Sequence, residues 1–310
     1  MRILFVTATR IGDAVLTTGL VDYLSHAFPE ARFTIVCGPV AAGIFTHLPG
    51  RQETIILEKR PFDAHWLSLW SRVLWRQWDW VIDLRGSGLS LFLWTRRRSI
   101  MRGGRREGHR LRHVGAVLGL SEPPFPVVWT STEDNALAAE LMPKGPPIIG
   151  LGPTANWKGK VWPGDRFVAF FHRLREVIPG ARPAVFGGPG PAEAVLTAPV
   201  LAALPEAIDL TGRLSLSQAA ACLTRTSLFV GNDSGLMHLA AAAGSPTLGL
   251  FGPSRATEYA PAGRRTLALV APGPTGCAAM GGLTVDIVAK AAQTLLFEHR
   301  DTPWPNILTC

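Results

Sequence analysis

The feature that most constrains the fold is a repeated alternation of short apolar runs with helical segments. The runs RILFVTA, ARFTIVCG and WDWVIDLRG in the first half, and PIIGLGP, SLFVGND and PTLGLFG in the second, are apolar without strict polar alternation. Strands that are buried on both faces of a parallel sheet have this pattern, and helices connect them. The sequence therefore predicts an α/β protein built on doubly wound parallel sheets.

The alternation pauses at MPKGPP, residues 142–147, where adjacent prolines and a glycine indicate a linker. The chain has 310 residues and a hydrophobic content of 47%, which is enough for two cores. We therefore expect two Rossmann-like domains, 1–142 and 147–310, that face a central cleft. The last predicted helix, about 284–299, is a candidate for packing back on the first domain.

Ligands of open α/β sheets bind beyond the carboxyl ends of the strands, so polar residues that follow strands are the first candidates for a site. Asp13 follows the first strand at the place of a helix N-cap, and a cap alone would explain it. The same carboxylate could act as a general base on a sugar hydroxyl. Lys158 and Lys160 follow the first strand of the second domain, where they either meet a phosphate or belong to an exposed loop.

The stretch GNDSGLMHLAAAAG, residues 231–244, carries more polar chemistry than a strand-to-helix turn requires. We expect Asp233 to cap the helix, while Ser234 and Gly235 leave backbone N–H groups open and His238 adds a donor one turn later. A helix N-terminus with free amides binds anions. This turn therefore predicts a site for a nucleotide diphosphate.

A second loop, GGPGPA at 187–192, resembles a dinucleotide loop but does not match GxGxxG. Glu193 directly after it could bind a ribose, or it could be an ordinary first-turn acid that interacts with the helix dipole. The chain has no GxxxxGK[ST], GxSxG or HExxH, and no two aspartates at i and i+2. We therefore expect no metal and no other cofactor, with protein cations and amides stabilising any leaving diphosphate.

Positive charge is concentrated at 96–113, where eight arginines, Arg105 and Arg106 among them, accompany one acid. Such a cluster attracts phosphates, anionic lipid, nucleic acid or an acidic sugar, unless it is simply a solvated face. Charge is even elsewhere and no nucleic-acid module is recognised, so nucleic acid is not an expected partner. A stripe with Trp66, Trp70 and Trp78 indicates a helix on a sheet, with a membrane-surface role as the alternative.

The cell compartment follows from what the sequence lacks. No signal peptide and no apolar run long enough to span a bilayer is recognised, and the four cysteines contain no CxxC pair. We expect a cytoplasmic protein with reduced thiols, peripheral on the cytoplasmic face of the inner membrane at most.

Several ordered motifs resemble glycosyltransferase family 9, the lipopolysaccharide heptosyltransferases. They are MRILFVTATRIGDAVLTTGL at the start, WDWVIDLRGSGLS, KVWPGDRF, NDSGLMHLAAAAGSPTLGLFGPS and the closing LTVDIVAKAAQTLL. The resemblance implies a GT-B fold, with the acceptor held by the first domain and the nucleotide sugar by the second. It further implies inverting, metal-independent transfer of a heptose from ADP-L-glycero-D-manno-heptose to the inner core of lipopolysaccharide.

The resemblance also implies roles for individual residues. Asp13 would be the general base. For the arginine cluster at 96–113 we add a hypothesis of our own: with an anionic lipid-linked saccharide as acceptor, Arg105 and Arg106 would contact it. The implied donor-binding residues are Lys160 at the phosphates, Glu193 at the ribose, Leu214 at the adenine, and Asp233, Ser234, Gly235 and His238 in the turn. Two alternatives stay open: a transferase of the same family with another nucleotide sugar or acceptor, and an inactive member with a binding role. An NAD-dependent oxidoreductase would need a fingerprint that this chain lacks.

Overall fold

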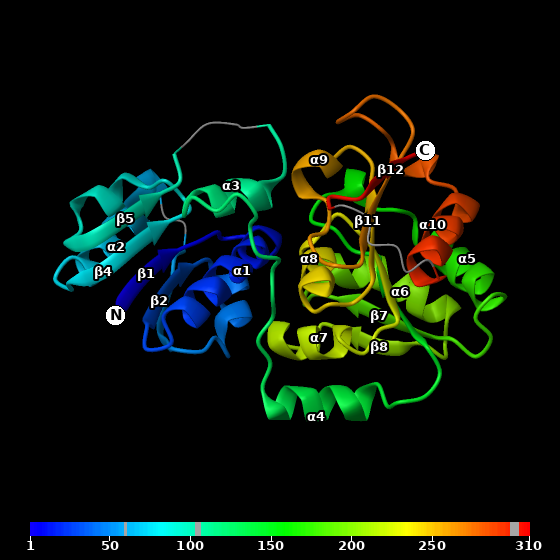
Figure 1. Ribbon diagram of the computed structural model, residues 1–310. Helices are drawn as coiled ribbons and strands as arrows, with labels where there is room; N and C mark the ends of the chain where they lie inside the picture. Colours follow the sequence, from blue (N-terminus) through cyan, green and yellow to red (C-terminus); the bar gives the residue numbers. More distant parts are fainter. Residues whose placement is uncertain (59–60, 103–106, 298–303) are drawn as a thin grey trace. The chain divides into compact units, whose positions relative to one another are not determined.

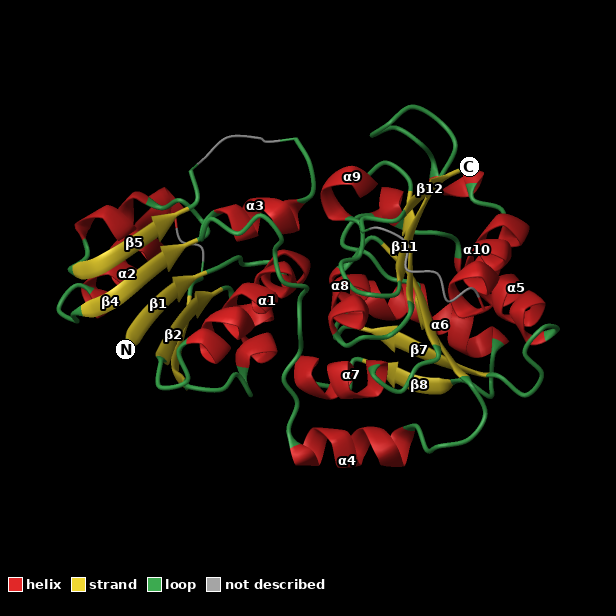
Figure 2. Ribbon diagram, viewed as in Figure 1, coloured by secondary structure: helices red, strands yellow, loops and turns green. Residues whose placement is uncertain are grey.

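The protein consists of two compact units, Met1–Trp129 and Thr130–Cys310, each built on one parallel sheet (Figure 1). The computed structural model describes residues 1–58, 61–102, 107–297 and 304–310. Helices cover both faces of each sheet (Figure 2). The predicted α/β class with doubly wound parallel sheets is confirmed.

The first unit has a five-stranded sheet in the order β3-β2-β1-β4-β5. Its strands are β1 Arg2–Val6, β2 Arg32–Cys37, β3 Arg51–Ile56, β4 Trp78–Asp83 and β5 Thr95–Ile100. Its helices are α1 Ile11–Ala27, η1 Pro39–Phe45, η2 Pro61–Asp63, α2 Ala64–Val73, η3 Gly88–Phe92 and α3 Arg110–Ala116. The chain winds outward from β1 to β3 and then crosses to β4, so the strand order reverses between β1 and β4.

Helices α1 and α2 lie on opposite faces of this sheet. Trp80 of β4 meets Phe28, the residue after α1, edge to face, whereas Val81 belongs to the cluster beneath α2. Trp66 and Trp70 pack against that same cluster, so the predicted packing of the tryptophan stripe on a sheet is confirmed. The helix ends at Val73, and the buried Trp78 already belongs to β4.

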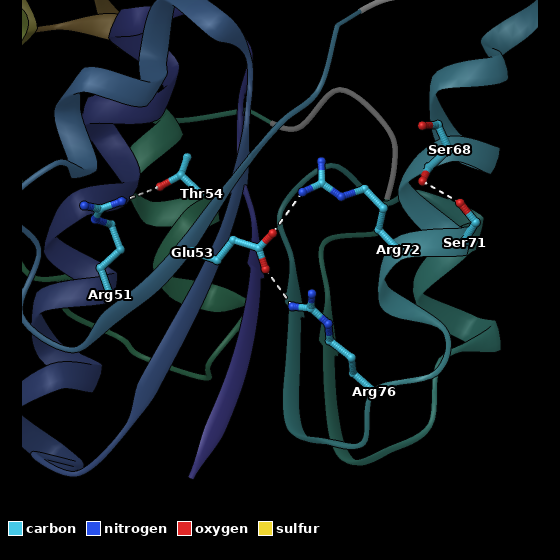
Figure 3. A network of polar contacts seen from close by, with 7 residues as sticks. All are labelled: Arg51, Glu53, Thr54, Ser68, Ser71, Arg72 and Arg76. Atoms are coloured by element: carbon cyan, nitrogen blue, oxygen red, sulfur yellow. Dashed lines mark hydrogen bonds and ion pairs between the residues drawn. The ribbon is translucent and has the colours of Figure 1, made fainter.

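A charged network ties α2 to the edge strand β3. The two carboxylate oxygens of Glu53 accept hydrogen bonds from Arg72 at 2.9 Å and Arg76 at 2.6 Å (Figure 3). The hydrogen bond from Arg76 is the main reason why the pKa of Glu53 is lowered, partial burial opposes it, and the charges of both arginines add to it. Ionised Glu53 therefore favours the folded state.

We expect Glu53→Gln to lower stability at neutral pH and to lose this effect in acid. A carboxyl group with a lowered folded-state pKa contributes stability above its unfolded pKa of about 4.3, and the contribution disappears as pH falls through the folded-state value. Both arginines are about half exposed, so each ion pair contributes only about 0.2–1 kcal/mol. Denaturant unfolding of wild type and variant at pH 7 and pH 4 checks this. The control is Glu206→Gln, which removes a carboxylate held by one arginine, Arg175, among the described residues. An equal difference in unfolding free energy between wild type and Glu53→Gln at both pH values contradicts the prediction.

The second unit has a seven-stranded sheet in the order β12-β11-β10-β9-β6-β7-β8. Its strands are β6 Ile148–Gly152, β7 Arg182–Gly187, β8 Ile208–Thr211, β9 Leu228–Asn232, β10 Thr247–Phe251, β11 Thr266–Val270 and β12 Ile307–Thr309. Its helices are α4 Thr132–Leu141, η4 Lys158–Lys160, α5 Gly164–Arg175, α6 Pro191–Ala203, α7 Leu216–Leu223, α8 Gly235–Ala242, α9 Ala256–Tyr259, η5 Met280–Gly282 and α10 Val285–Phe297. Here the order reverses between β6 and β9.

Helix α4 belongs to the second unit, so the boundary between the units lies before this helix. The proline-rich segment 142–147 predicts the boundary there, but the change in contacts falls between Trp129 and Thr130. The reason is that α4 packs on α7 of the second unit, and the Arg225 guanidinium donates to the carbonyl of Met142, the residue after α4. A capping box of Ser131 and Asp134 starts this helix. The last helix, α10, packs on α5 and β11 of its own unit.

One hydrophobic core cluster of the second unit lies on the side of α5 and α10. Trp162, Phe167, Phe170 and Phe171 are all fully buried there, and Trp162 meets Phe167 edge to face with ring centroids 4.9 Å apart. The indole N–H of Trp162 donates to the carbonyl of Leu283 at 2.9 Å, which satisfies its polar atom in the core. Within the described ranges, no helix is both long and apolar enough to cross a membrane.

Candidate functional site

The candidate donor residues follow four strands that are neighbours in the second sheet. The order β9-β6-β7-β8 places the carboxyl ends of these strands side by side. Asp233 follows β9, Lys160 follows β6, Glu193 follows β7 and Leu214 follows β8. The reversal of strand order between β6 and β9 is the position where open α/β sheets bind ligands.

Lys160 and Asp233 form an ion pair across this reversal. The Nζ atom of Lys160 lies 2.6 Å from Oδ2 of Asp233, although the two residues are far apart in sequence. The side chains are only 25% and 7% exposed, so water screens the pair far less than an exposed one. The pair fixes an ammonium group at the carboxyl end of β6, where an anionic ligand would bind.

The turn at the start of α8 differs from its predicted form in one respect. The sequence predicts Asp233 as the cap, but the N-cap position belongs to Ser234, and its side chain makes no capping hydrogen bond. Asp233 is unavailable as a cap because its carboxylate binds Lys160. The first N–H groups of α8, beginning at Gly235, therefore have no side-chain acceptor from a cap. His238 is buried one turn further on, and its N–H donates to the carbonyl of Ser234 at 3.4 Å.

Buried polar atoms without a protein partner gather around this turn. Among the residues that the structure describes, Nδ2 of Asn232 and the Oγ atoms of Ser234 and Ser254 are buried and make no hydrogen bond. Asn232 ends β9 and Ser254 follows β10, the adjacent strand. Buried polar groups are normally paired, so these three atoms indicate a polar ligand. Sequence analysis missed Asn232 and Ser254, because only burial distinguishes them from ordinary turn residues.

Asn232 also holds the loop that carries Lys160. Its Oδ1 atom accepts the backbone N–H of Trp162 at 3.0 Å, and Trp162 is anchored in the core by its indole. The loop is thus held from β9 on one side and from the segment before α10 on the other. The position of Lys160 therefore depends on the fold of the second unit rather than on its own loop.

The remaining donor candidates have simpler environments. Oε2 of Glu193 accepts the N–H of Gly188 at 3.0 Å, which holds the carboxylate over the loop after β7. Leu214 is half-buried in the loop between β8 and α7, beyond Gly212, whose φ of +66° marks a tight turn. The structure joins Lys160 directly to Asp233 and places the other two further along the same edge.

In the first unit, Asp13 lies at the reversal between β1 and β4. The sequence predicts an N-cap at Asp13, but α1 begins two residues earlier, at Ile11, with Arg10 as the N-cap. Asp13 is instead in the first helical turn, as an acid near the positive end of the helix dipole. Within the described part of the chain, its half-exposed carboxylate makes no hydrogen bond or ion pair. It is therefore available as a proton acceptor.

A buried aspartate organises the neighbouring strand end. Asp83, fully buried at the end of β4, accepts the N–H of Arg85 at 2.8 Å and the hydroxyl of Ser87 at 2.6 Å, and it also binds the hydroxyl of Ser90. These bonds fold the loop after β4 back onto its strand. Sequence analysis did not single out Asp83, since an Asp at a strand end is common.

The predicted acceptor contacts and the predicted metal independence stay predictions. Arg105 and Arg106, the predicted acceptor contacts, lie outside the described residues. The part of the chain that the structure describes contains no group of three or more His, Cys, Asp or Glu residues arranged to hold a metal ion.

Solved structures of similar fold are known. A glycosyl transferase family 9 protein from Veillonella parvula matches with a TM-score of 0.80 at 22% identity, covering 96% of this chain and 97% of the other. The Escherichia coli ADP-heptose lps heptosyltransferase II matches with a TM-score of 0.75 at 20% identity, over 96% and 99% of the two chains. The fold is thus of the GT-B type, an α/β architecture of two Rossmann-like units.

Sequence comparison narrows this class to one family. Residues 115–279 match Glycosyltransferase family 9 (heptosyltransferase), and the chain belongs to this family. Lipopolysaccharide heptosyltransferase 2 of Salmonella typhimurium is 25% identical over 297 residues, 82% of this chain and 83% of the relative. Lipooligosaccharide heptosyltransferase 2 of Haemophilus influenzae is 32% identical over 121 residues, 37% of this chain and 34% of the relative.

Proposed function

We propose that the protein transfers a heptose from ADP-L-glycero-D-manno-heptose to the inner core of lipopolysaccharide, with inversion at the anomeric carbon. Membership of glycosyltransferase family 9 supports the class of reaction. The observation that carries the proposal is the ion pair of Lys160 and Asp233 beside the uncapped start of α8. This arrangement offers an ammonium group and backbone N–H groups to one diphosphate.

The donor site would act on the leaving group. When the glycosidic bond to ADP breaks, negative charge grows on the departing phosphate. Lys160 and the N–H groups at Ser234 and Gly235 oppose that charge with groups that are already in place. The buried hydroxyls of Ser234 and Ser254 would supply further donors, and each would gain a hydrogen-bond acceptor in the diphosphate.

The base would act on the acceptor. Asp13 takes the proton of the acceptor hydroxyl while that oxygen attacks the anomeric carbon from the face opposite ADP. Attack from that face inverts the anomeric configuration. The carboxylate needs no rearrangement to accept the proton, because it has no competing hydrogen bond among the described residues.

We further propose that the transfer is independent of metal, with Lys160 in the place that a divalent cation would take at the diphosphate. Glu193 would hold the ribose, Leu214 would line the adenine and His238 would complete the turn. The acceptor would be an anionic lipid-linked saccharide, which places the enzyme on the cytoplasmic face of the inner membrane. Arg105 and Arg106 would contact that acceptor.

A nucleotide panel tests the donor part of the proposal. We expect calorimetry in the presence of EDTA to show ADP binding at least about tenfold tighter than UDP, GDP or NAD, a free-energy difference of about 1.4 kcal/mol. Preference for UDP or GDP would retain the transferase and refute the ADP-heptose donor. Tight NAD binding would refute the nucleotide-sugar site itself. Transfer from synthetic ADP-heptose, with and without EDTA, then tests the sugar and the metal independence.

A further inference from the structure

Helix α2, the η3 segment and the residues that directly follow them carry large apolar side chains that are exposed to solvent. Trp75 is 88% exposed, Trp94 is 78% exposed and Leu91 is 62% exposed. We call these three residues, together with Leu67 and Phe92, the outer apolar surface. Among described large apolar residues at least as exposed as Leu91, all but Val195 lie between residues 62 and 94. An exposed apolar concentration of this kind marks an interaction site.

The packing beneath these residues brings them to one side of the unit. Leu69 and Val73 of α2 pack into the same buried cluster as Leu89 and Leu93 from the η3 segment. The two elements therefore cover the same face of the sheet.

Pairing of the strands places the two exposed tryptophans at one end of that face. The N–H of Trp78, the first residue of β4, donates to the carbonyl of Trp94 at 3.0 Å. Trp75 lies in the turn that leads into β4, and Trp94 directly precedes β5. Both thus lie at the amino-terminal edge of the sheet. Asp13 follows the opposite, carboxyl-terminal edge, so catalysis does not explain these tryptophans.

The charge around the outer apolar surface is positive. Residues 62–102 contain seven arginines and three aspartates, and two of the arginines, Arg72 and Arg76, share the carboxylate of Glu53, which leaves a net charge of +3. Arg98 donates to the carbonyls of Ser90 and Leu93 and has no carboxylate partner among the described residues. No described carboxylate therefore neutralises its charge. An anionic partner fits this surface better than a neutral or cationic one.

We propose that the outer apolar surface docks on an anionic lipid bilayer. Tryptophan is the side chain that best occupies the boundary between headgroups and acyl chains, and Phe92 and the two leucines would bury beside it. The arginines would add attraction to anionic headgroups, and this binding free energy grows with the number of arginines near the membrane. The inference deepens the proposed function, since a lipid-linked acceptor lies in a membrane, but its test needs no transfer reaction.

Vesicle flotation with the full chain tests this inference. We expect binding to phosphatidylcholine vesicles that contain phosphatidylglycerol, weaker binding to phosphatidylcholine alone, and loss of binding at high salt. The double substitution Trp75→Ala with Trp94→Ala should weaken partitioning at least about tenfold. Vesicles with brominated acyl chains should quench tryptophan fluorescence in wild type more than in the double variant.

Two controls separate the surface from general destabilisation. Tyr23→Ala removes an exposed aromatic side chain of α1 in the same unit and should leave vesicle binding unchanged. The double variant should keep its melting temperature within about 2 °C and its affinity for ADP, since both tryptophans are in solvent. Equal vesicle binding by wild type and double variant overturns the inference, as does a wild type that does not bind. Self-association that only the double variant loses would assign the surface to a second copy instead. A wild-type protein that binds vesicles but not ADP would refute the proposed donor and retain the inference about the outer apolar surface.

Discussion

Asp13→Asn should lower kcat by about 10²–10⁴-fold while leaving the affinity for ADP unchanged. A positioned general base contributes a factor of this size, and an amide cannot accept the proton. The substitution preserves shape at a half-exposed position of the first turn of α1, so the fold should tolerate it. Single-turnover transfer from ADP-heptose measures the chemical step, and calorimetry measures ADP binding.

The control for this prediction is Asp165→Asn. Asp165 is also an acid in the first turn of a helix, α5, and has the same relation to a helix dipole without any predicted role in chemistry. Its loss should leave kcat within about twofold of wild type, because an exposed surface substitution rarely matters. If Asp13→Asn is as active as Asp165→Asn, another group takes the proton.

Lys160→Ala should lower kcat/KM by about 10²–10³-fold and weaken ADP binding. The ammonium group is the cation fixed at the carboxyl end of β6, and removing one preorganised donor from a developing anion has this effect on rate. The substitution also leaves Asp233, 7% exposed, without its partner, and two like charges then face each other when a diphosphate binds. Melting curves measured beside the kinetics separate lost stability from lost catalysis.

Lys158→Ala is the matched control, since Lys158 belongs to the same η4 segment and is exposed. It should change ADP affinity by less than about threefold, as expected for an exposed charge in salt. Equal losses in the two variants would mean that the loop acts through its overall charge rather than through one positioned ammonium group. The double variant Lys160→Ala with Asp233→Ala should recover part of the stability but not the activity.

The sequence identifies most of the candidate residues but not their pairing. Lys160 and Asp233 both follow apolar runs, and the family resemblance distinguishes Lys160 from Lys158. That they touch depends on β6 and β9 being neighbours, and strand order follows from the packing of the whole sheet. The two wrong cap predictions have a local cause. Helix α1 begins at Ile11, two residues before Asp13. Helix α8 begins at Gly235, two residues after Asp233, whose carboxylate binds Lys160 instead of capping the helix.

Other parts of the site could not be predicted because they depend on burial. Asn232, Ser254 and Asp83 are ordinary turn residues in the sequence, and only their burial distinguishes them. The division of the chain into compact units depends on tertiary contacts in the same way. Proline and glycine at 142–147 do mark a turn, but the tertiary contacts of α4 with α7 decide to which unit the preceding helix belongs.

Trp162 connects three segments that are distant in the sequence: its backbone is held by Asn232 and its indole by Leu283. A redesign of the enzyme for another nucleotide sugar therefore has unequal freedom around the site. Exchange of residues 280–283 would shift Lys160, the proposed phosphate contact, although none of them follows β6. The loop that carries Glu193 is held by the bond from Gly188 to Glu193 within it, and the loop that carries Leu214 is tied to the end of β7 by the N–H of Gly212. These loops are the places where the proposed ribose and adenine contacts can be altered without moving Lys160.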